Sequence, residues 1–410
     1  MSNETSYPKE KINILFLENI SDKAVQLFRQ NGYSSVEKLS GALTESELIE
    51  KIKDVHLLGI RSKTNITPAV LDAAKKLQAI GCFCIGVNQV DLKAATKHGV
   101  TVFNAPYSNT RSVAELVIGA SVILIRRILD KNIAAHNGIW MKDAKGCFEV
   151  RGKTIGLVGY GNIGSQVSVL AESIGMKVIY FDIEKKLPLG NASSCDSLEE
   201  LVSVSDIISL HVPETPKTKN LINEALLEQF KKGSILINYA RGEVVDINAL
   251  AKYLQNGHLS GAAVDVFPVE PEKNGDIFTS PLQGLSNVLL SPHIGGSTEE
   301  AQQNIGEDVS SKLFTFLEAG VTNGSHTVPA IMLPPMEGAH RILHIHKNVP
   351  GVLGGINTLL SENHINISAQ YLKTNEEIGY VVLDVDSEIS DVALELLRNV
   401  KETIKVRVLY

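Results

Sequence analysis

Short apolar runs that alternate with amphipathic helical patterns constrain the fold of this chain more than any other feature. A first series has strand-like runs at 12–17, 55–60, 78–84 and 100–103. A second series has them at 154–158, 178–182, 206–211, 234–238, 261–266 and 288–291. Strands that alternate with helices form parallel sheets covered on both faces, so each series predicts a doubly wound α/β unit.

The chain after residue 335 has a different pattern, and a segment rich in Gly and Pro at 320–335 precedes it. We expect a strand at 342–346, a helix at 352–362, strands at 365–372 and 379–386, a helix at 391–400 and a strand at 403–409. This βαββαβ order is typical of a ferredoxin-like module. The Gly/Pro segment predicts a domain boundary.

Helix-start signals refine this division. Thr44–Glu47 and Ser112–Glu115 both match a capping box, and Pro68 stands where a first helical residue is expected. The helix from Ser112 to about Ile128 is apolar nearly all round, which predicts burial on every side, between domains or subunits. A helix that starts near residue 297 is expected to return to the first unit. The predicted domains are 1–107 with 296–336, 108–295 and 337–410.

Composition excludes several function classes. The chain has 39 Lys and Arg against 46 Asp and Glu, a net charge of −7, and no basic block. It is therefore not expected to bind nucleic acid or a membrane surface, although a local basic pocket for a small anion is compatible with this balance. The apolar run at 116–125 is about half of a membrane span. The N-terminal residues are polar and mixed in charge, unlike a signal peptide.

Cysteine usage favours a reduced, cytoplasmic setting. The four cysteines form no CxxC pair and are too few for a disulfide framework: Cys82, Cys84, Cys147 and Cys195. Cys82 and Cys84 lie in an apolar run, so we interpret them as buried strand residues rather than as a metal or redox pair. No metal site is predicted.

The segment Gly159-Tyr160-Gly161-Asn162-Ile163-Gly164 carries the clearest chemical signal. It follows the run at 154–158 and opens a helix, as a dinucleotide-binding turn does. The first two glycines allow a tight turn and close approach of a pyrophosphate, and the third allows helix and strand to pack. Asp182 ends the next strand. A carboxylate there accepts hydrogen bonds from both ribose hydroxyls and repels a 2′-phosphate, which favours NAD over NADP.

Three further strand ends carry polar side chains. Arg241 follows the run at 234–238, Asp265 and Glu270 follow 261–266, and His293 follows 288–291. Ligands of open α/β sheets bind at this edge. An Arg there suits a carboxylate, and a His beside a Glu suits an acid/base couple.

These four motifs, in this order, resemble the D-isomer-specific 2-hydroxyacid dehydrogenase family over residues 12 to about 330. The resemblance implies that Arg241 holds the substrate carboxylate, that His293 takes the hydroxyl proton and that Glu270 tunes it. It also implies an NAD site that adds Ala240, Asp265, Gly295 and Gly296 to the glycine turn, with Asp265 near the nicotinamide.

The segments at 79–92, 103–119 and 291–306 resemble the regulated branch of this family, which oxidises 3-phospho-D-glycerate. Arg61, Ser62 and Lys63 follow the run at 55–60 and are the expected phosphate site. The branch tends to have Arg where this chain has Lys63, and Lys lacks the planar fork of Arg. Loop residues Cys84, Ile85 and Gly86 are expected to help hold the substrate, and Lys142 is a second candidate for the phosphate.

The C-terminal module resembles an ACT domain, which binds amino acids where two modules meet. The ligand residues carried over are His346, Asn348 and Asn366, with L-serine as the implied effector. Asn348 is expected in a strand-to-helix loop with free backbone amides. The resemblance further implies a homotetramer, and it leaves room for a side activity on 2-oxoglutarate. A dehydrogenase for glycerate or lactate and a non-catalytic NAD sensor remain alternatives.

Overall fold

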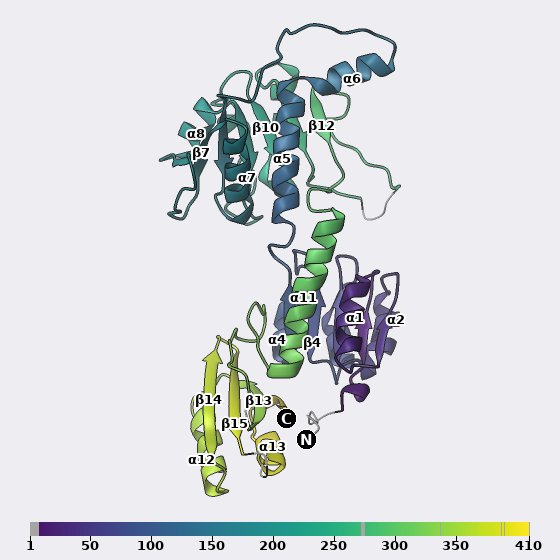
Figure 1. Cartoon of the computed structure of the whole chain (residues 1–410), viewed down its shortest axis with the longest axis vertical. Helices are drawn as coiled ribbons and strands as arrows, with labels where there is room; N and C mark the ends of the chain where they lie inside the picture. Colours follow the sequence, from purple (N-terminus) through teal and green to yellow (C-terminus); the bar gives the residue numbers. More distant parts are fainter. Residues whose placement is uncertain (1–7, 272–274, 337, 387, 389, 410) are drawn as a thin grey trace. The chain divides into compact units, whose positions relative to one another are not determined.

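The computed structural model describes residues 8–271, 275–336, 338–386, 388 and 390–409 (Figure 1). The chain divides into two compact units, Met1–Ser108 with Gln302–Tyr410, and Asn109–Ala301. They contain one parallel sheet each, and the first unit also contains an antiparallel sheet. The predicted fold class, two doubly wound sheets and a ferredoxin-like module, is confirmed.

The first parallel sheet has the strand order β2-β1-β3-β4-β5. Its strands are β1 (Ile14–Phe16), β2 (Val36–Lys38), β3 (Leu57–Ile60), β4 (Ala79–Cys82) and β5 (Thr101–Asn104). The order reverses between β1 and β3, which is where open α/β sheets bind ligands. The sequence patterns did not predict β2, whose short segment has only one buried residue, Val36.

Helices cover both faces of this sheet. One face packs on α1 (Asp22–Gln30), and the other on α2 (Glu45–Lys51), α3 (Pro68–Ala73) and α4 (Leu92–Lys97). The capping box of Thr44 and Glu47 is present, and Pro68 occupies the first turn of α3. The helix predicted to return to this sheet does so: Ile305, Val309 and Leu313 of α11 (Glu299–Ala319) pack into the same core as α1.

The second parallel sheet has the order β12-β11-β10-β9-β6-β7-β8. Its strands are β6 (Thr154–Val158), β7 (Lys177–Phe181), β8 (Ser193–Ser194), β9 (Ile207–Leu210), β10 (Ile235–Asn238), β11 (Gly261–Val264) and β12 (Val288–Leu290). Helices α5 (Thr110–Ile125) and α7 (Asn162–Ser173) lie side by side on one face (Figure 1). The other face packs on α8 (Leu198–Val204), α9 (Glu224–Leu227) and α10 (Ile247–Gln255).

The expected cap of α5 is wrong. The helix begins at Thr110 after Asn109, so Ser112 lies inside the first turn and does not cap it; its hydroxyl instead contacts that of Thr298 at 2.9 Å. Within this chain the helix is buried on one side only, and its burial against another subunit stays a prediction. Val113, Val117 and Leu124 are buried, but its other side is only partly covered and includes exposed Gly119. A helix α6 (Ile128–His136) follows, with no buried residue.

The C-terminal sheet has the order β14-β15-β13-β16, as in a ferredoxin-like module. Its strands are β13 (His340–Lys347), β14 (Ile367–Thr374), β15 (Ile378–Val385) and β16 (Thr403–Leu409). Helices α12 (Val352–Glu362) and α13 (Ser390–Arg398) cover one face. The other face packs against Val328, Ile331 and Leu333, so the Gly/Pro segment is partly incorporated into the module's core. A buried pair, Arg341 with Asp384, joins β13 to β15 at 2.7 Å.

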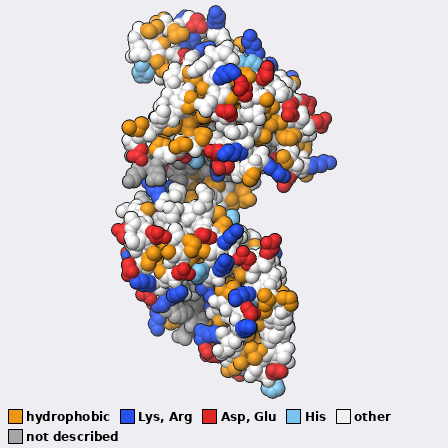
Figure 2. Space-filling view, turned by 180° about the vertical axis from the view of Figure 1, so that it is seen from behind, with side chains coloured by type: hydrophobic (Ala, Val, Ile, Leu, Met, Phe, Trp, Pro, Cys, Tyr) orange, Lys and Arg blue, Asp and Glu red, His pale blue; other side chains and the backbone are white. Residues whose placement is uncertain are grey.

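Acidic and basic side chains are interspersed on the face that Figure 2 shows. None of the described helices combines the length and the apolar character needed to cross a bilayer. All four cysteines are free. Cys82 is buried in β4 as predicted, while Cys84 lies beyond the strand end and is half-buried. Within the described ranges, no cluster of three metal-ligating side chains occurs.

Candidate active site

The glycine turn between β6 and α7 has the geometry of a phosphate cradle. Gly159 has φ of +93°, and a Cβ there would lie 2.5 Å from the carbonyl oxygen of His211. A Cβ on Gly164 would lie 2.3 Å from the carbonyl oxygen of Gly159, so helix and strand approach too closely for a side chain. A Cβ on Gly161 would meet nothing within 4 Å. Glycine is therefore required for packing at two positions, and the space over Gly161 is open to a ligand.

Asn162 and Ile163 form the first turn of α7, whose N-terminus begins directly at this open space. Asp182 follows β7 and is tied to the turn, since its Oδ2 accepts a hydrogen bond of 2.7 Å from the N–H of Tyr160. Its Oδ1 accepts another from the N–H of Glu184. The structure thus brings the predicted acidic residue to the glycine turn.

His211 contributes to this site and was missed by sequence reasoning. It follows β9, the strand beside β6, and its N–H donates to the carbonyl of Val158. Burial lowers the pKa of this ring to about 3, so it is neutral at pH 7. Its Nε2 contacts the Ser209 hydroxyl at 3.0 Å. The sequence could have indicated His211 only if β9 had been predicted to lie beside β6, the strand that precedes the glycine turn.

Glu270 and His293 form the predicted acid/base couple. Glu270 Oε2 lies 2.8 Å from His293 Nδ1, and Oε1 accepts a hydrogen bond of 2.9 Å from the N–H of Phe267. His293 adopts a left-handed backbone, with φ of +55°. Its side chain is 52% exposed, which leaves the ring accessible to a substrate.

Each member of the couple shifts the pKa of the other. The hydrogen bond that Glu270 accepts from the ring raises the pKa of His293, against burial, which lowers it. Burial by itself would raise the pKa of Glu270, but hydrogen bonds from His293 and from the Phe267 N–H outweigh it, and the pKa falls. The charge of Arg241 lowers the pKa of both groups, so Arg241 lies near the couple.

Asp265 fixes the loop that carries His293. The carboxylate is buried and accepts hydrogen bonds from the Ser291 hydroxyl at 2.6 Å and from the Ile294 and Gly295 N–H groups at 2.9 and 2.7 Å. Its backbone carbonyl accepts from the His293 N–H at 2.8 Å. The side chain therefore holds the backbone around His293 and Gly295.

Arg241 follows β10, which lies directly beside β11 in the sheet. Its Nη1 donates to the carbonyl of Ala240 at 2.7 Å, and the side chain of Asn238 bonds the backbone of both residues. Gly242 packs so tightly that a Cβ would lie 2.1 Å from the Phe267 carbonyl carbon. The loops after β10 and β11 are thus in contact, which brings Arg241 to the edge that carries Glu270.

In the first unit, a buried carboxylate organises the Arg61 loop. Glu18, after β1, accepts hydrogen bonds from the backbone N–H groups of Arg61, Lys63 and Thr64 at 3.0–3.1 Å. Ser62 and Lys63 are exposed. Sequence reasoning missed Glu18, whose φ of +57° and long-range contacts leave no local signal. The loop lies at the switch point of this sheet.

The Arg61 guanidinium donates to Gln302 Oε1 of α11 at 2.8 Å. In the neighbouring loop, Cys84 Sγ contacts the Gly86 carbonyl at 3.3 Å, and Ile85 accepts from the Asn104 side chain. These predicted residues therefore lie in structured loops at the same edge of the first sheet. Lys142 is exposed in a segment of the other unit and makes no hydrogen bond to another candidate residue among those described.

The predicted effector residues lie on the C-terminal sheet, but one chain does not bring them together. His346 is buried in β13, with Nδ1 2.8 Å from the Lys347 carbonyl and no partner for Nε2 among the described residues. Asn348 follows β13 beside the start of β15, while Asn366 precedes β14 beside the end of β15. In the loop where free amides are expected, the N–H of Asn348 donates to the Glu377 carbonyl and that of Val349 to the Lys347 carbonyl, so these two amides are not free.

The residues present fit NAD. An open glycine turn at a helix N-terminus suits a pyrophosphate, and Asp182 stands at the adjoining strand end as a ribose acceptor. The couple of Glu270 and His293 lies at the same edge of the same parallel sheet. This arrangement can hold a dinucleotide and move a proton at His293 Nε2.

Comparisons with known proteins agree with this geometry. Residues 118–295 match the model of the D-isomer specific 2-hydroxyacid dehydrogenase NAD binding domain, and residues 342–405 match an AHAS small subunit-like ACT domain. D-3-phosphoglycerate dehydrogenase of Haemophilus influenzae is 52% identical over 100% of both chains. That of Escherichia coli strain K12 is 51% identical over 99% of this chain and 100% of its own.

Among solved structures, D-lactate dehydrogenase of Aquifex aeolicus, complexed with NAD and lactic acid, has a TM-score of 0.66 and 26% identity to this chain. The match covers 78% of this chain and 100% of that one. The cofactor is NAD. The chain belongs to the D-isomer specific 2-hydroxyacid dehydrogenase family, among the D-3-phosphoglycerate dehydrogenases.

Proposed function

We propose that this chain oxidises 3-phospho-D-glycerate to 3-phosphohydroxypyruvate with NAD, as the first step of L-serine biosynthesis. The observation that carries the proposal is the 2.8 Å hydrogen bond between Glu270 and His293, with Arg241 near it. Relatives named D-3-phosphoglycerate dehydrogenase that match the whole chain support the choice of substrate.

Each group has a defined task in this reaction. Arg241 binds the substrate carboxylate through its guanidinium. Glu270 accepts a hydrogen bond from the Nδ1–H of His293, which leaves Nε2 free to take the proton of the C2 hydroxyl. The glycine turn and Asp182 would hold NAD, whose chemistry would be to take up the C2 hydride. The O–H and C2–H bonds break, a C=O bond forms, and the carboxylate of Glu270 stabilises the protonated ring.

The phosphate is assigned to Arg61, Ser62 and Lys63. Glu18 engages the backbone N–H groups of Arg61, Lys63 and Thr64, so these three amides are not available to the ligand, and recognition is assigned to the side chains. Arg61 is already oriented by Gln302, while Ser62 and Lys63 are exposed. This supports a phosphorylated substrate over glycerate or lactate. Lys142 is a second candidate that no contact within its unit supports.

Regulation by L-serine is assigned to the C-terminal module, through His346, Asn348 and Asn366. Because Asn348 and Asn366 lie at opposite ends of β15, a site that uses both requires a second module. β14 is an edge strand with unpaired backbone groups, which suits pairing with another copy. The partly uncovered apolar helix α5 supports a further contact between subunits, and together these two surfaces are compatible with a homotetramer.

We further propose the division into residues 1–107 with 296–336, 108–295 and 337–410, which the three separate sheets support. The four free cysteines support a reduced, cytoplasmic setting.

Initial rates of NAD reduction with 3-phospho-D-glycerate, glycerate and lactate test the proposal. We expect kcat/KM to be highest for the phosphorylated acid. Arg61→Ala should raise its KM and leave an unphosphorylated acid nearly unaffected, while exposed Lys53→Ala serves as a matched control. An equal rise of KM for both acids would mean that Arg61 has a structural role and does not bind the phosphate. NAD binding without oxidation of any of the three would overturn the proposal in favour of a sensor. Reduction of 2-oxoglutarate with NADH tests the side activity.

A further inference from the structure

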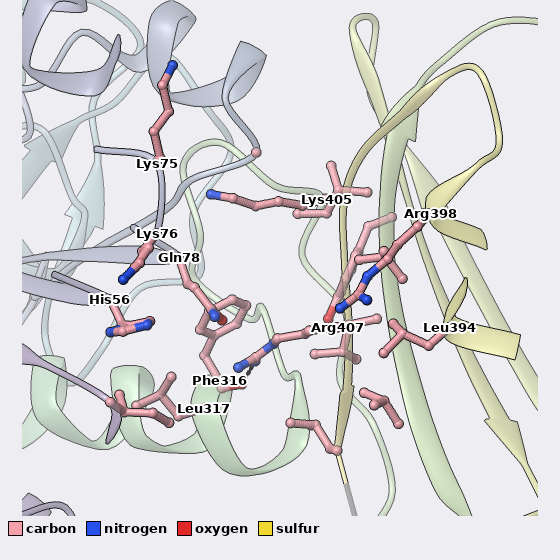
Figure 3. Close-up of a pocket in the computed structure, with 18 of the residues that line it drawn as sticks. His56, Lys75, Lys76, Gln78, Phe316, Leu317, Leu394, Arg398, Lys405 and Arg407 are labelled. Carbon is pink, nitrogen blue, oxygen red and sulfur yellow. Dashed lines mark hydrogen bonds between the residues drawn. The ribbon is translucent and has the colours of Figure 1, made fainter. Parts of the chain in front are cut away.

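A cavity of about 420 Å³ lies within the first unit, and no residue of the Arg61 loop lines it. One wall is formed by β16 and α13 of the C-terminal module. The opposite wall is formed by the segment from Lys75 to Gln78, before β4, and by the end of α11 (Figure 3). The cavity therefore joins the module to the first parallel sheet, and its size is in the range of small-molecule sites.

The charges that line this cavity are strongly unbalanced. Of the described residues that line it, five are cationic and one is a carboxylate: Lys75, Lys76, Arg398, Lys405, Arg407, and Asp391. Two of the cations have their own partners, since Lys76 pairs with Asp54 and Arg398 with Glu395. No described carboxylate lies within ion-pair distance of Lys405 or Arg407. The charge of Glu318 raises the pKa of Arg407 from beyond ion-pair distance, so the centre of the cavity holds two cations without a carboxylate in direct contact.

Lys405 and Arg407 both extend from β16 into the cavity (Figure 3). The Lys405 ammonium donates to the carbonyl of Leu77, across the cavity. Arg407 Nη2 donates to the Phe316 carbonyl, and its Cζ lies 4.6 Å from the centre of the Phe316 ring. These contacts hold both side chains in place but use only part of their donor capacity, because Lys has three donors and Arg five.

Burying the charged Lys405 and Arg407 side chains costs free energy when no anion lies between them. Burial is the main cause that lowers the pKa of Lys405, to about 7, and the neighbouring Arg407 adds to it. Burial also lowers the pKa of Arg407. Charged groups are removed from water at considerable cost unless they are paired. An anion between them would supply the missing counter-charge and accept the unused donors.

We propose that this cavity binds a small multivalent anion, a phosphate or a dicarboxylate, held by Lys405 and Arg407 of β16. The site is distinct from the substrate and L-serine sites and does not depend on either assignment. Because its walls come from two sheets, an anion that occupies it would stabilise their packing on each other.

Isothermal titration of the full chain with inorganic phosphate, and separately with succinate, tests this proposal. The Arg61→Ala background removes phosphate binding at the substrate loop. Lys405→Met and Arg407→Met keep most of the side-chain volume, and Lys401→Met, exposed near the start of β16 and outside the cavity, is the matched control. We expect one site per chain that persists in Arg61→Ala and in Lys401→Met. It should weaken about 10- to 100-fold in Lys405→Met and Arg407→Met, as for loss of a hydrogen bond to a charged group.

Thermal unfolding keeps the test valid if a variant is less stable. Phosphate should raise the Tm of the Arg61→Ala chain and of Lys401→Met in that background, and the same phosphate concentration should raise the Tm of Lys405→Met in that background by less. Binding of succinate without phosphate would identify the ligand as a dicarboxylate, within the proposed chemistry. Phosphate binding that Arg61→Ala abolishes, with no succinate site, would overturn the proposal. Equal binding by Lys405→Met, Arg407→Met and Lys401→Met would overturn it too.

Discussion

Glu270 Oε2 lies 2.8 Å from His293 Nδ1, and this hydrogen bond is the largest cause of the raised pKa of the His293 ring. The two shifts have opposite signs. The raised pKa of His293 stabilises the fold below the usual value of 6.5, and that contribution is lost as the pH rises through the folded pKa. The lowered pKa of Glu270 stabilises the fold above the usual 4.5 and is lost as the pH falls through its folded pKa. The pair therefore contributes most to the stability of the fold between the two usual values, pH 4.5 and pH 6.5.

The same hydrogen bond sets the pH dependence of catalysis. Neutral His293 is the base, so kcat/KM should rise with pH through its pKa, which lies above 6.5. Glu270→Gln removes the negative charge and should move this limb to lower pH. The measurement is the pH profile of kcat/KM, with exposed Glu228→Gln as control. A limb that stays in place would mean that Glu270 only supports the loop.

His293→Ala should reduce kcat by about 10²- to 10⁴-fold, the usual contribution of a positioned acid or base. NAD affinity should change little, because the glycine turn and Asp182 lie at other strand ends. Single-turnover kinetics and NADH fluorescence titration measure the two effects separately. Substituting His136, on the exposed helix α6, provides the control. Wild-type kcat in His293→Ala would exclude this residue as the base.

Asp182 is expected to exclude NADP by charge. Asp182→Asn keeps an oxygen that can accept from the Tyr160 N–H but removes the charge. It should weaken NAD binding and narrow the preference for NAD over NADP, and Asp182→Ala should add the loss of the turn contact. Dissociation constants for both cofactors measure this. If the wild-type enzyme used NADP as well as NAD, the argument from Asp182 would fail.

Periodic and capping patterns predicted most of the fold, because they are local. The strand at 154–158 and the helix at 352–362 agree with the structure to the residue, and Thr44 caps its helix as expected. Ser112 was misjudged because a capping box inside a helix looks the same as one at its start. Strand β8 was missed because two exposed serines have no apolar pattern.

The candidate site was predictable where a reactive side chain directly follows a strand, as at Arg241, Glu270 and His293. Glu18 and His211 could not be found in this way. Glu18 acts on a loop 43–46 residues away, and His211 acts because β9 happens to lie beside β6. Both depend on strand order, which local patterns do not encode. The separation of Asn348 from Asn366 likewise follows from sheet register.

Glu18 provides a prediction that the sequence did not. Its carboxylate accepts hydrogen bonds from the N–H groups of Arg61, Lys63 and Thr64, so Glu18→Ala leaves one buried and two part-buried donors without this partner. We expect a loss of about 1–3 kcal/mol per uncompensated group and a higher KM for 3-phospho-D-glycerate, with NAD affinity unchanged. Denaturant unfolding and steady-state kinetics measure these effects. Exposed Glu50→Ala is the control, and equal KM values in the two variants would contradict an organising role.

The geometry of the effector residues predicts complementation between subunits. Asn348 and Asn366 flank opposite ends of β15, and the seven steps from Ile378 to Val385 separate them by about 24 Å at 3.4 Å per residue. A serine molecule cannot contact both within one chain. If Asn348 of one subunit meets Asn366 of another, each symmetric dimer has two sites. Asn348→Ala and Asn366→Ala should then each abolish inhibition by L-serine while catalysis persists.

A mixed dimer of these two variants has one site with both substitutions and one intact site. Co-expression of the two chains should therefore restore partial inhibition, and L-serine titration should find about half the wild-type number of sites in the purified mixed species. A dimer in which both chains carry both substitutions should stay insensitive to L-serine. The exposed Asn399→Ala variant should be inhibited like the wild type. Mixed dimers as insensitive as either parent would show that the two residues do not share a site, because only a shared site is rebuilt by bringing the two chains together.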